Sequence, residues 1–379
     1  MPHNVCGSDD QSRSSPDPND FEFLHLSMMT KKILRKTAAR DRGAHGTKVT
    51  LGMVASACGV SPSTVSRILN GTAVVSPAKR EAVDRAIAAL GFTPNPVARG
   101  LAGGRTLSVG VVTQAIDSPF YGLALRGIEE ELGRAGYSPL FVSGHWNAVE
   151  EKRCIDILLS RRVDGLIILT GRLSDAALRS IAKSLPVVVT GRNLTAPSLY
   201  SLDFNNFQGA KIATHHLLML GHRKIAFING DPEHPDANER LRGYRAALKA
   251  AGVPFSPALV LPGNYLEKSG LEAVERLVDR RERFTAIFAA NDQMAFGAAL
   301  ALHRRGLRVP EDVSLVGFDD LAGAVHSIPP LTSIHQGPYE LGQIAAESLL
   351  RLLADEVPTQ CLPEPRLVIR NSTRALTTA

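Results

Sequence analysis

This sequence is poor in cysteine and in aromatic residues, and it contains no long apolar segment. The cysteines Cys6, Cys58, Cys154 and Cys361 are widely separated, and none has the spacing of a metal-ligand or redox pair. We interpret them as plain thiols of a protein from a reducing compartment. No apolar run approaches the roughly 18 residues that a membrane-spanning helix requires, and the acidic N-terminus lacks the apolar core of a signal peptide. These absences predict a cytoplasmic protein without a membrane partner.

Charge is distributed unevenly along the 379 residues. Residues 1–30 carry one Lys or Arg against five acids, whereas residues 31–105 carry 13 against three. The rest of the chain carries 29 of each sign. A basic segment ahead of a neutral body can be a solubilising tail. It is also typical of proteins that bind a polyanion, because neutralised phosphates release their counterions.

Residues 1–46 are rich in Ser, Asp, Pro and Arg and show no periodicity. We expect this N-terminal extension to be disordered. Met28 and Met29 stand just before the basic stretch TKKILRK. The translation start can therefore be Met1, Met28 or Met29.

Three short helices are predicted between residues 49 and 92, within a headpiece that we place at residues 47–93. Thr50 is a good N-cap for the first helix, and Gly59 can take the positive φ of a tight turn after it. Ser61 suits the N-cap of the second helix, and Pro62 suits its first position. The third helix begins with Ser76 and Pro77 and ends at Gly91.

The second of these helices has one apolar and one polar face. Val65 lies on the apolar face, which we expect to pack on the first helix, while Pro62, Ser63 and Arg67 project from the opposite face. In a helix-turn-helix, this end of the second helix enters the major groove, where Arg67 can donate two hydrogen bonds to guanine. A generic helical hairpin is the alternative. The small residues at the turn, within a basic segment, favour reading of DNA.

Residues 94–106 form an unusual linker after the headpiece. Asn95 can cap a helix there, and Gly103 and Gly104 would end it. A helix of under two turns is far shorter than the ~12 residues at which isolated helices become marginal. We expect it to form only beside its symmetry mate in a minor groove, with Leu101 as an apolar wedge. A plain Pro/Gly linker is the alternative.

Beyond residue 106, short apolar runs alternate with amphipathic helices, which predicts a doubly wound parallel sheet. The sequence also repeats a pattern of Leu, Arg, Gly and Ala-Gly in residues 125–137 and 241–253. Two similar α/β halves would explain this repeat, although helices that end in Ala-Gly are common. The predicted strands are residues 107–112, 163–169, 186–190, 224–228, 286–290 and 313–318.

Several motifs together resemble the lactose- and galactose-repressor (LacI/GalR) family of bacterial transcription regulators. They are VTLGMVASACGVSPSTVSRILNG, PNPVARGLAGGRT, LGHRKIAFI, ANDQMAFGA, VSLVGFDD and IPPLTSI. The resemblance implies an all-α helix-turn-helix headpiece and a core, residues 107–379, like the type I periplasmic sugar-binding proteins. In that core two Rossmann-like subdomains are joined by three crossovers. The N-subdomain would comprise about residues 107–205 and 335–352, and the C-subdomain about residues 206–334 and 353–379.

The resemblance also implies two sets of site residues. A homodimer would bind a near-palindromic double-stranded operator, and an effector would bind between the subdomains, at the strand ends. The expected DNA-contacting residues are Thr50, Pro62, Ser63, Thr64, Arg67, Asn70, Lys79, Arg80, Asn95, Ala98 and Leu101. The expected effector-binding residues, whose chemistry suits a sugar, a related polyol or a nucleoside, are Asp117, Phe120, Arg192, Arg240, Tyr265 and Asp292.

We therefore predict a ligand-responsive repressor, homodimeric and associated with the nucleoid, without a cofactor or metal. A solute-binding protein of a transporter would share the core, but the helix-turn-helix and the lack of an export signal disfavour it. An enzyme on the same core is disfavoured because the sequence offers no nucleophile elbow, phosphate loop or Ser/His/Asp arrangement. No leucine heptad follows RLVIRNSTR, which favours a dimer over a tetramer.

Overall fold

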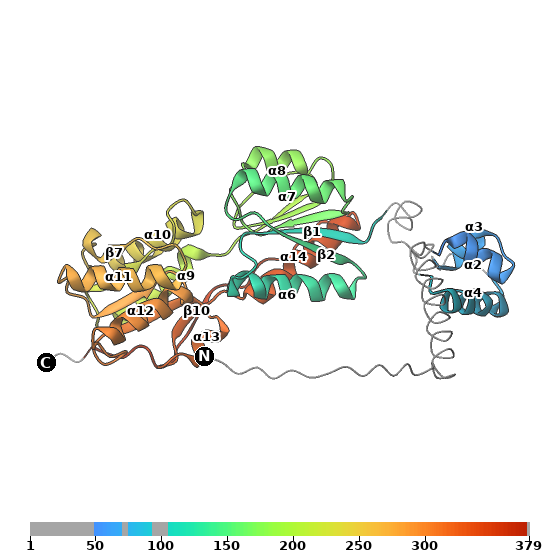
Figure 1. The fold of residues 1–379 in the computed structure, drawn as a ribbon. Helices are drawn as coiled ribbons and strands as arrows, with labels where there is room; N and C mark the ends of the chain where they lie inside the picture. The colour runs from blue at the N-terminus through green and yellow to red at the C-terminus, as the bar shows by residue number, and fades with distance from the viewer. Residues whose placement is uncertain (1–48, 70–74, 93–104, 377–379) are drawn as a thin grey trace, which may run out of the picture. The chain divides into compact units, whose positions relative to one another are not determined.

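A computed structural model describes residues 49–69, 75–92 and 105–376 of the chain. The chain divides into two compact units between Asn95 and Pro96: a unit of short helices and a larger α/β unit (Figure 1). Of the predicted site residues, Asn70, Asn95, Ala98 and Leu101 lie outside the described residues, as do the N-terminal extension and the hinge helix. No helix within the described ranges is long and apolar enough to cross a membrane.

The helical unit contains α2 (Leu51–Cys58), α3 (Pro62–Leu69) and α4 (Pro77–Leu90). Thr50 Oγ1 accepts a hydrogen bond from Met53 N at 3.4 Å, and Gly59 ends α2 with a φ of 67°. Ser61 Oγ accepts a hydrogen bond from Thr64 N at 3.2 Å. These contacts confirm the predicted boundaries of the first two helices.

The core of the helical unit is small. Val65 of α3 is fully buried against Val54 and Ala55 of α2, as predicted, and Val83 of α4 completes the cluster. The expected cap of α4 is only partly correct. Ser76 has extended backbone angles and precedes Pro77, but its side chain makes no capping hydrogen bond.

The α/β unit contains two sheets with the same strand order. The first has the order β2-β1-β3-β4-β5, and the second has the order β7-β6-β8-β9-β10-β11. All strand pairs are parallel except β10 with β11. The first half contains β1 (Ser108–Thr113), α6 (Pro119–Arg134), β2 (Ser138–Ser143), α7 (Ala148–Ser160), β3 (Gly165–Ile168), α8 (Asp175–Ile181), β4 (Val187–Thr190) and β5 (Leu199–Leu202).

Helices cover both faces of each sheet. In the first half, α7 and α8 lie on one face, and α6 and α14 (Pro338–Leu353) lie on the other (Figure 1). The second half comprises α9 (Asn206–Met219), β6 (Ile225–Ile228), α10 (Pro235–Ala250), β7 (Val260–Leu261), α11 (Glu267–Asp279), β8 (Ala286–Ala289), α12 (Asp292–Arg304), β9 (Ser314–Asp319), α13 (Ala322–His326), β10 (Thr332–His335) and β11 (Arg366–Val368).

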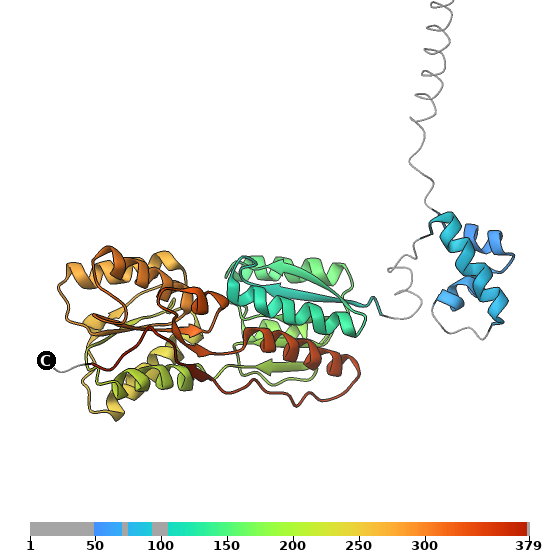
Figure 2. The same cartoon turned by 90° about the horizontal axis from the view of Figure 1, so that it is seen from below.

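The chain passes between the halves three times, as the family resemblance implies. The first passage joins β5 to α9, the second joins β10 to α14, and the third joins α14 to β11. Figure 2 shows the last of these as red segments that run between the two halves. Both sheets therefore contribute to one structural unit, and their facing ends can form a common site.

The two halves also share a packing detail that supports the predicted internal duplication. Gly127 of α6 and Gly243 of α10 occupy the same place in the repeated sequence pattern. A Cβ atom on Gly127 would lie 2.2 Å from the carbonyl oxygen of Tyr339 in α14. A Cβ atom on Gly243 would lie 2.2 Å from the carbonyl oxygen of Phe207 in α9. Each half thus needs a glycine where its two helices meet.

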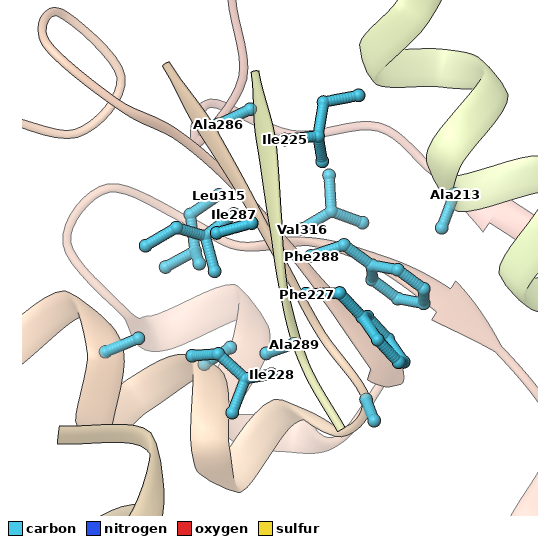
Figure 3. Close-up of a cluster of buried hydrophobic side chains, with 14 of the residues drawn as sticks. Ala213, Ile225, Phe227, Ile228, Ala286, Ile287, Phe288, Ala289, Leu315 and Val316 are labelled. Carbon is cyan, nitrogen blue, oxygen red and sulfur yellow. The ribbon is translucent and has the colours of Figure 1, made fainter. Parts of the chain in front are cut away.

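The second half buries much of the scarce aromatic content of the chain. Phe227 of β6 and Phe288 of β8 are register partners with ring centroids 5.0 Å apart, and both are fully buried. Figure 3 shows these two rings on one face of the sheet, toward Ala213 of α9, with Ile287 and Leu315 on the other face. This core holds the strand ends of the second half in place.

Candidate functional site

The outward face of α3 carries the predicted DNA-contacting residues. Pro62, Ser63 and Arg67 are exposed, whereas Thr64 is half-buried. Ser61 Oγ lies 2.9 Å from Ser63 Oγ and 2.8 Å from Thr64 Oγ1, so the hydroxyl groups form a local cluster at the start of the helix. Arg67 Nε donates to the carbonyl oxygen of Ser63 at 3.4 Å. This face is small and polar, with a single long basic side chain.

Three further predicted DNA contacts also lie at the surface. Thr50 is exposed at the start of α2, and Lys79 and Arg80 are exposed in the first turn of α4. The surface therefore presents hydroxyl groups and cations at two helix starts, where positive backbone ends favour a phosphate.

A cavity of about 260 Å³ lies between the two halves of the α/β unit. Its walls come from the carboxyl ends of equivalent strands in the two sheets, which is the expected place for a ligand in doubly wound folds. From the first half come Asp117, Phe120, Tyr121, Trp146, Thr170 and Thr190. From the second half come Asp231, His234, Asp236, Arg240, Asn264, Tyr265, Asn291, Gln293 and Asp319.

Four of the six predicted effector residues line this cavity. Asp117 and Phe120 follow β1, Arg240 extends from α10, and Tyr265 precedes α11. The ring of Tyr265 occupies the space that a Cβ atom on Gly230 would need, at 2.1 Å. Among the described residues, the buried hydroxyl group of Tyr265 has no hydrogen-bond partner.

Arg192, another of the six, does not line the cavity. Its Nη1 donates to Asp175 Oδ1 at 3.0 Å, and its Nη2 donates to the carbonyl oxygen of Gly171. These contacts hold the guanidinium at the start of α8. The neighbouring residue, Gly191, lines the cavity instead.

Asp292 also departs from the prediction. Its side chain is fully buried, and it accepts hydrogen bonds from Leu321 N at 2.7 Å and Ser333 Oγ at 2.6 Å. A Cβ atom on Gly317 would lie 2.1 Å from Asp292 Oδ1, so the carboxyl group fits only against a bare strand. Burial raises its pKa well above the usual value. Asp292 links α12 to β9 and β10, and its neighbours Asn291 and Gln293 line the cavity.

Arg240 is the most densely bonded side chain of the cavity. Its Nε donates to Asn206 Oδ1 at 2.9 Å, and its Nη1 donates to the carbonyl oxygen of Ala290. The guanidinium lies 4.0 Å from the centroid of the Phe318 ring and 4.0 Å from Asp319 Oδ1. Burial raises the pKa of Asp319 to about 7, and the nearby Arg240 offsets part of that shift.

A column of three rings crosses the cavity, and sequence reasoning missed it. The rings of Trp146 and His234 stack at 3.7 Å, and His234 and Tyr265 stack at 5.5 Å. Trp146 has a φ of 54°, which is uncommon for a bulky residue. Gln114 holds this turn, because its Oε1 accepts from Trp146 N at 2.8 Å and its Nε2 donates to Thr170 O at 2.9 Å.

Ion pairs join the halves near the same place. Arg172 of the first half contacts Glu233 and lies 3.5 Å from Asp231, both in the second half. Trp146, His234, Asp236 and Asp319 could have been predicted only by applying the strand-end rule to every strand. No group of three or more His, Cys, Asp or Glu side chains in the described part of the chain is placed to hold a metal ion.

Two family descriptions match the chain. Residues 50–95 match bacterial regulatory proteins of the lacI family, and residues 214–373 match a periplasmic binding protein-like domain. The HTH-type transcriptional regulator CelR of Thermobifida fusca is 37% identical over 333 residues, 85% of this chain and 98% of CelR. The HTH-type transcriptional repressor PurR of Haemophilus influenzae (strain PittEE) is 35% identical over 335 residues, 86% of this chain and 99% of PurR.

Solved structures show the same similarity. A complex of the transcriptional regulator CelR with cellobiose superposes with a TM-score of 0.64 at 36% identity, covering 86% of this chain and 99% of CelR. The lac repressor dimer bound to operator and the anti-inducer ONPF gives a TM-score of 0.79 at 32% identity, covering 87% of this chain and all of that chain. These relatives are transcription regulators.

Proposed function

This chain belongs to the lacI family of bacterial regulatory proteins, and on that premise we propose that it is a ligand-responsive repressor that binds a near-palindromic operator as a homodimer. The observation that carries the proposal is that one chain combines an exposed polar face on α3 with a ligand-sized cavity. Such a protein acts where the DNA is, in the cytoplasm. The lac repressor, a relative solved as a dimer on its operator, supports the proposed assembly.

We assign the DNA contacts by chemistry. Pro62 and Ser63 allow close approach to the bases, and Arg67 donates to a guanine edge in the major groove. The exposed residues Lys79 and Arg80 contact phosphates, which position the headpiece but carry little sequence information. Phosphate contacts are also assigned to Thr50, Thr64 and Asn70, and contacts in the central minor groove to Asn95, Ala98 and Leu101.

The effector occupies the cavity between the halves. Asp117 accepts hydrogen bonds from ligand hydroxyl groups, Arg240 donates to ligand oxygens, and Phe120 and Tyr265 supply apolar ring surface. The structure of CelR with cellobiose, a disaccharide, supports a sugar-like ligand for this cavity.

Coupling between the cavity and the DNA is thermodynamic. An effector changes operator affinity only if it binds the DNA-competent and incompetent states unequally, an effect typically worth about 1–3 kcal/mol. The contacts that join the halves, Trp146 to His234 and Arg172 to Glu233, are the contacts that a ligand in the cavity can alter. Closure of the two halves thereby reports on the occupancy of the cavity.

The DNA-binding part is tested by a matched pair of arginine variants. A genomic fragment selected by the purified protein serves as the operator. Arg67→Ala should lower its affinity for that fragment by about 1–3 kcal/mol per half-site, because a base contact is lost. Arg85→Ala removes the same charge from an exposed site on α4 and should weaken binding to all DNA slightly and equally. Equal losses for both variants on specific and random duplexes would contradict base reading by Arg67.

A further inference from the structure

The cavity is lined by an excess of carboxyl groups. Asp117, Asp231, Asp236 and Asp319 line it, whereas Arg240 is the single guanidinium and no lysine contributes. His234 adds no compensating charge at neutral pH, because burial lowers the pKa of its imidazole. The chain as a whole carries a formal net charge of +6, so the sign of this cavity opposes that of the molecule.

The existing ion pairs leave part of this charge uncompensated. Arg172 lies 3.5 Å from Asp231, and Arg240 lies 4.0 Å from Asp319. Within the described ranges, Asp117 and Asp236 form no ion pair. Arg240 is already committed, since two of its nitrogens donate to protein oxygens.

The remaining polar groups of the cavity are neutral. Asn264, Asn291 and Gln293 offer amide groups, and the buried Tyr265 hydroxyl has no partner among the described residues. An ionised carboxylate only accepts hydrogen bonds, so a ligand that satisfies Asp117 and Asp236 must bring donors. A phosphate or carboxylate on the ligand would instead face like charge in a partly dry site.

We propose that this cavity selects an uncharged, hydroxyl-rich ligand and excludes phosphorylated sugars and nucleotides. The proposal rests on the function proposed above, because it specifies the chemical class of the effector at the same site. Like charge at this range predicts that a phosphate ester binds about 100-fold more weakly than the parent sugar, or more weakly still.

Trp146 makes the charge of the cavity measurable without a known ligand. It is the single tryptophan of the chain and lines the cavity. Its fluorescence can be quenched by iodide, by caesium and by neutral acrylamide at pH 8.5, where Asp319 is ionised. We expect caesium to quench Trp146 more effectively than iodide, after each is normalised to N-acetyltryptophanamide. Equal quenching, or stronger quenching by iodide, would overturn the proposal.

Charge-removing variants locate the origin of the effect. Asp117→Asn and Asp236→Asn should each reduce the preference for caesium. Asp279→Asn removes the same charge from an exposed site at the end of α11 and should leave the preference unchanged. An equal change in all three variants would assign the preference to the general surface and overturn the proposal.

A ligand titration separates this inference from the proposed function. Cellobiose and D-glucose are compared with D-glucose 6-phosphate and inorganic phosphate by Trp146 fluorescence and by release or recruitment of selected DNA. If a phosphate compound binds as tightly as a neutral sugar and changes DNA affinity, the charge inference fails and the proposed function stands. If the protein selects no DNA, the proposed function fails, and the quenching result still decides the charge of the cavity.

Discussion

The two halves of the α/β unit have the same strand order and the same glycine-mediated contact between two helices, yet they contribute different chemistry to the cavity. The first half supplies mainly aromatic and hydroxyl groups, such as Phe120, Trp146 and Thr170. The second half supplies most of the charge, including Asp236 and Arg240. Helix packing constrains the shared scaffold, whereas the strand-end loops are free to diverge.

One position of the repeated pattern shows this divergence directly. Arg240 in α10 corresponds to Ala124 in α6, because each directly precedes the shared Leu-Arg-Gly. Both residues are buried, but Ala124 packs in an apolar core while Arg240 faces Asp319 and the Phe318 ring. The same place in the scaffold therefore serves packing in one half and electrostatics in the other.

The largest expected effect comes from removing the charge that distinguishes the second half. Arg240→Met should lower the free energy of unfolding at pH 8 by about 3 kcal/mol, since it leaves Asp319 buried without a cation. Chemical denaturation checks this value. Arg242→Met, at an exposed neighbouring position, serves as the control and should have almost no effect.

The loss should also depend on pH. The folded-state pKa of Asp319 is about 7, above its usual 3.8, so the folded protein binds this proton more readily than the unfolded chain. The stability that Asp319 contributes is fully present below about pH 4 and is lost as pH rises through about 7. Arg240→Met raises the folded pKa further, so its cost should shrink at pH 5.5. A cost that is the same at both pH values would contradict the pairing with Asp319.

The next effect tests what the halves have in common. Gly127→Ala and Gly243→Ala each place a methyl group against a helix backbone, and each should cost about 1–3 kcal/mol of unfolding free energy. Gly133→Ala lies in α6 with open space around it and should be neutral or stabilising by up to about 1 kcal/mol. If only one of the two buried glycines mattered, the halves would not share this packing.

The smallest effect concerns the contact between the halves. Trp146→Ala removes the stack on His234, worth about 0.5–1.5 kcal/mol, and should shift the α/β unit toward a more open arrangement. Small-angle X-ray scattering of the ligand-free protein should show a larger radius of gyration. Val149→Ala, an exposed position on α7, is the control. An unchanged radius for Trp146→Ala would show that the stack does not hold the halves together.

Local sequence signals predicted the helical unit well. Caps such as Thr50 and Ser61 act within a few residues, and Val65 announces its buried face through helical spacing alone. The central strands were equally clear, because each is a continuous apolar run. The edge strand β2 was missed because its residues are partly exposed, and β11 because it is short and follows a distant helix.

The cavity was predicted less completely than the fold. Family motifs located Arg240 and Tyr265, but motif position alone could not show that Arg192 turns toward Asp175 or that Asp292 bonds to Ser333. These orientations depend on loops from several strands. Trp146 enters the cavity through a turn that the distant Gln114 holds, which no local pattern reveals.

The measurement that tests the central claim most directly is reciprocal linkage between the cavity and the DNA. Effector affinity is read from Trp146 fluorescence with and without a saturating selected operator, and operator affinity is measured with and without effector. We predict that both affinities change by the same factor, because coupling free energy is reciprocal. An effector affinity that is identical with and without operator would show that the cavity does not control DNA binding.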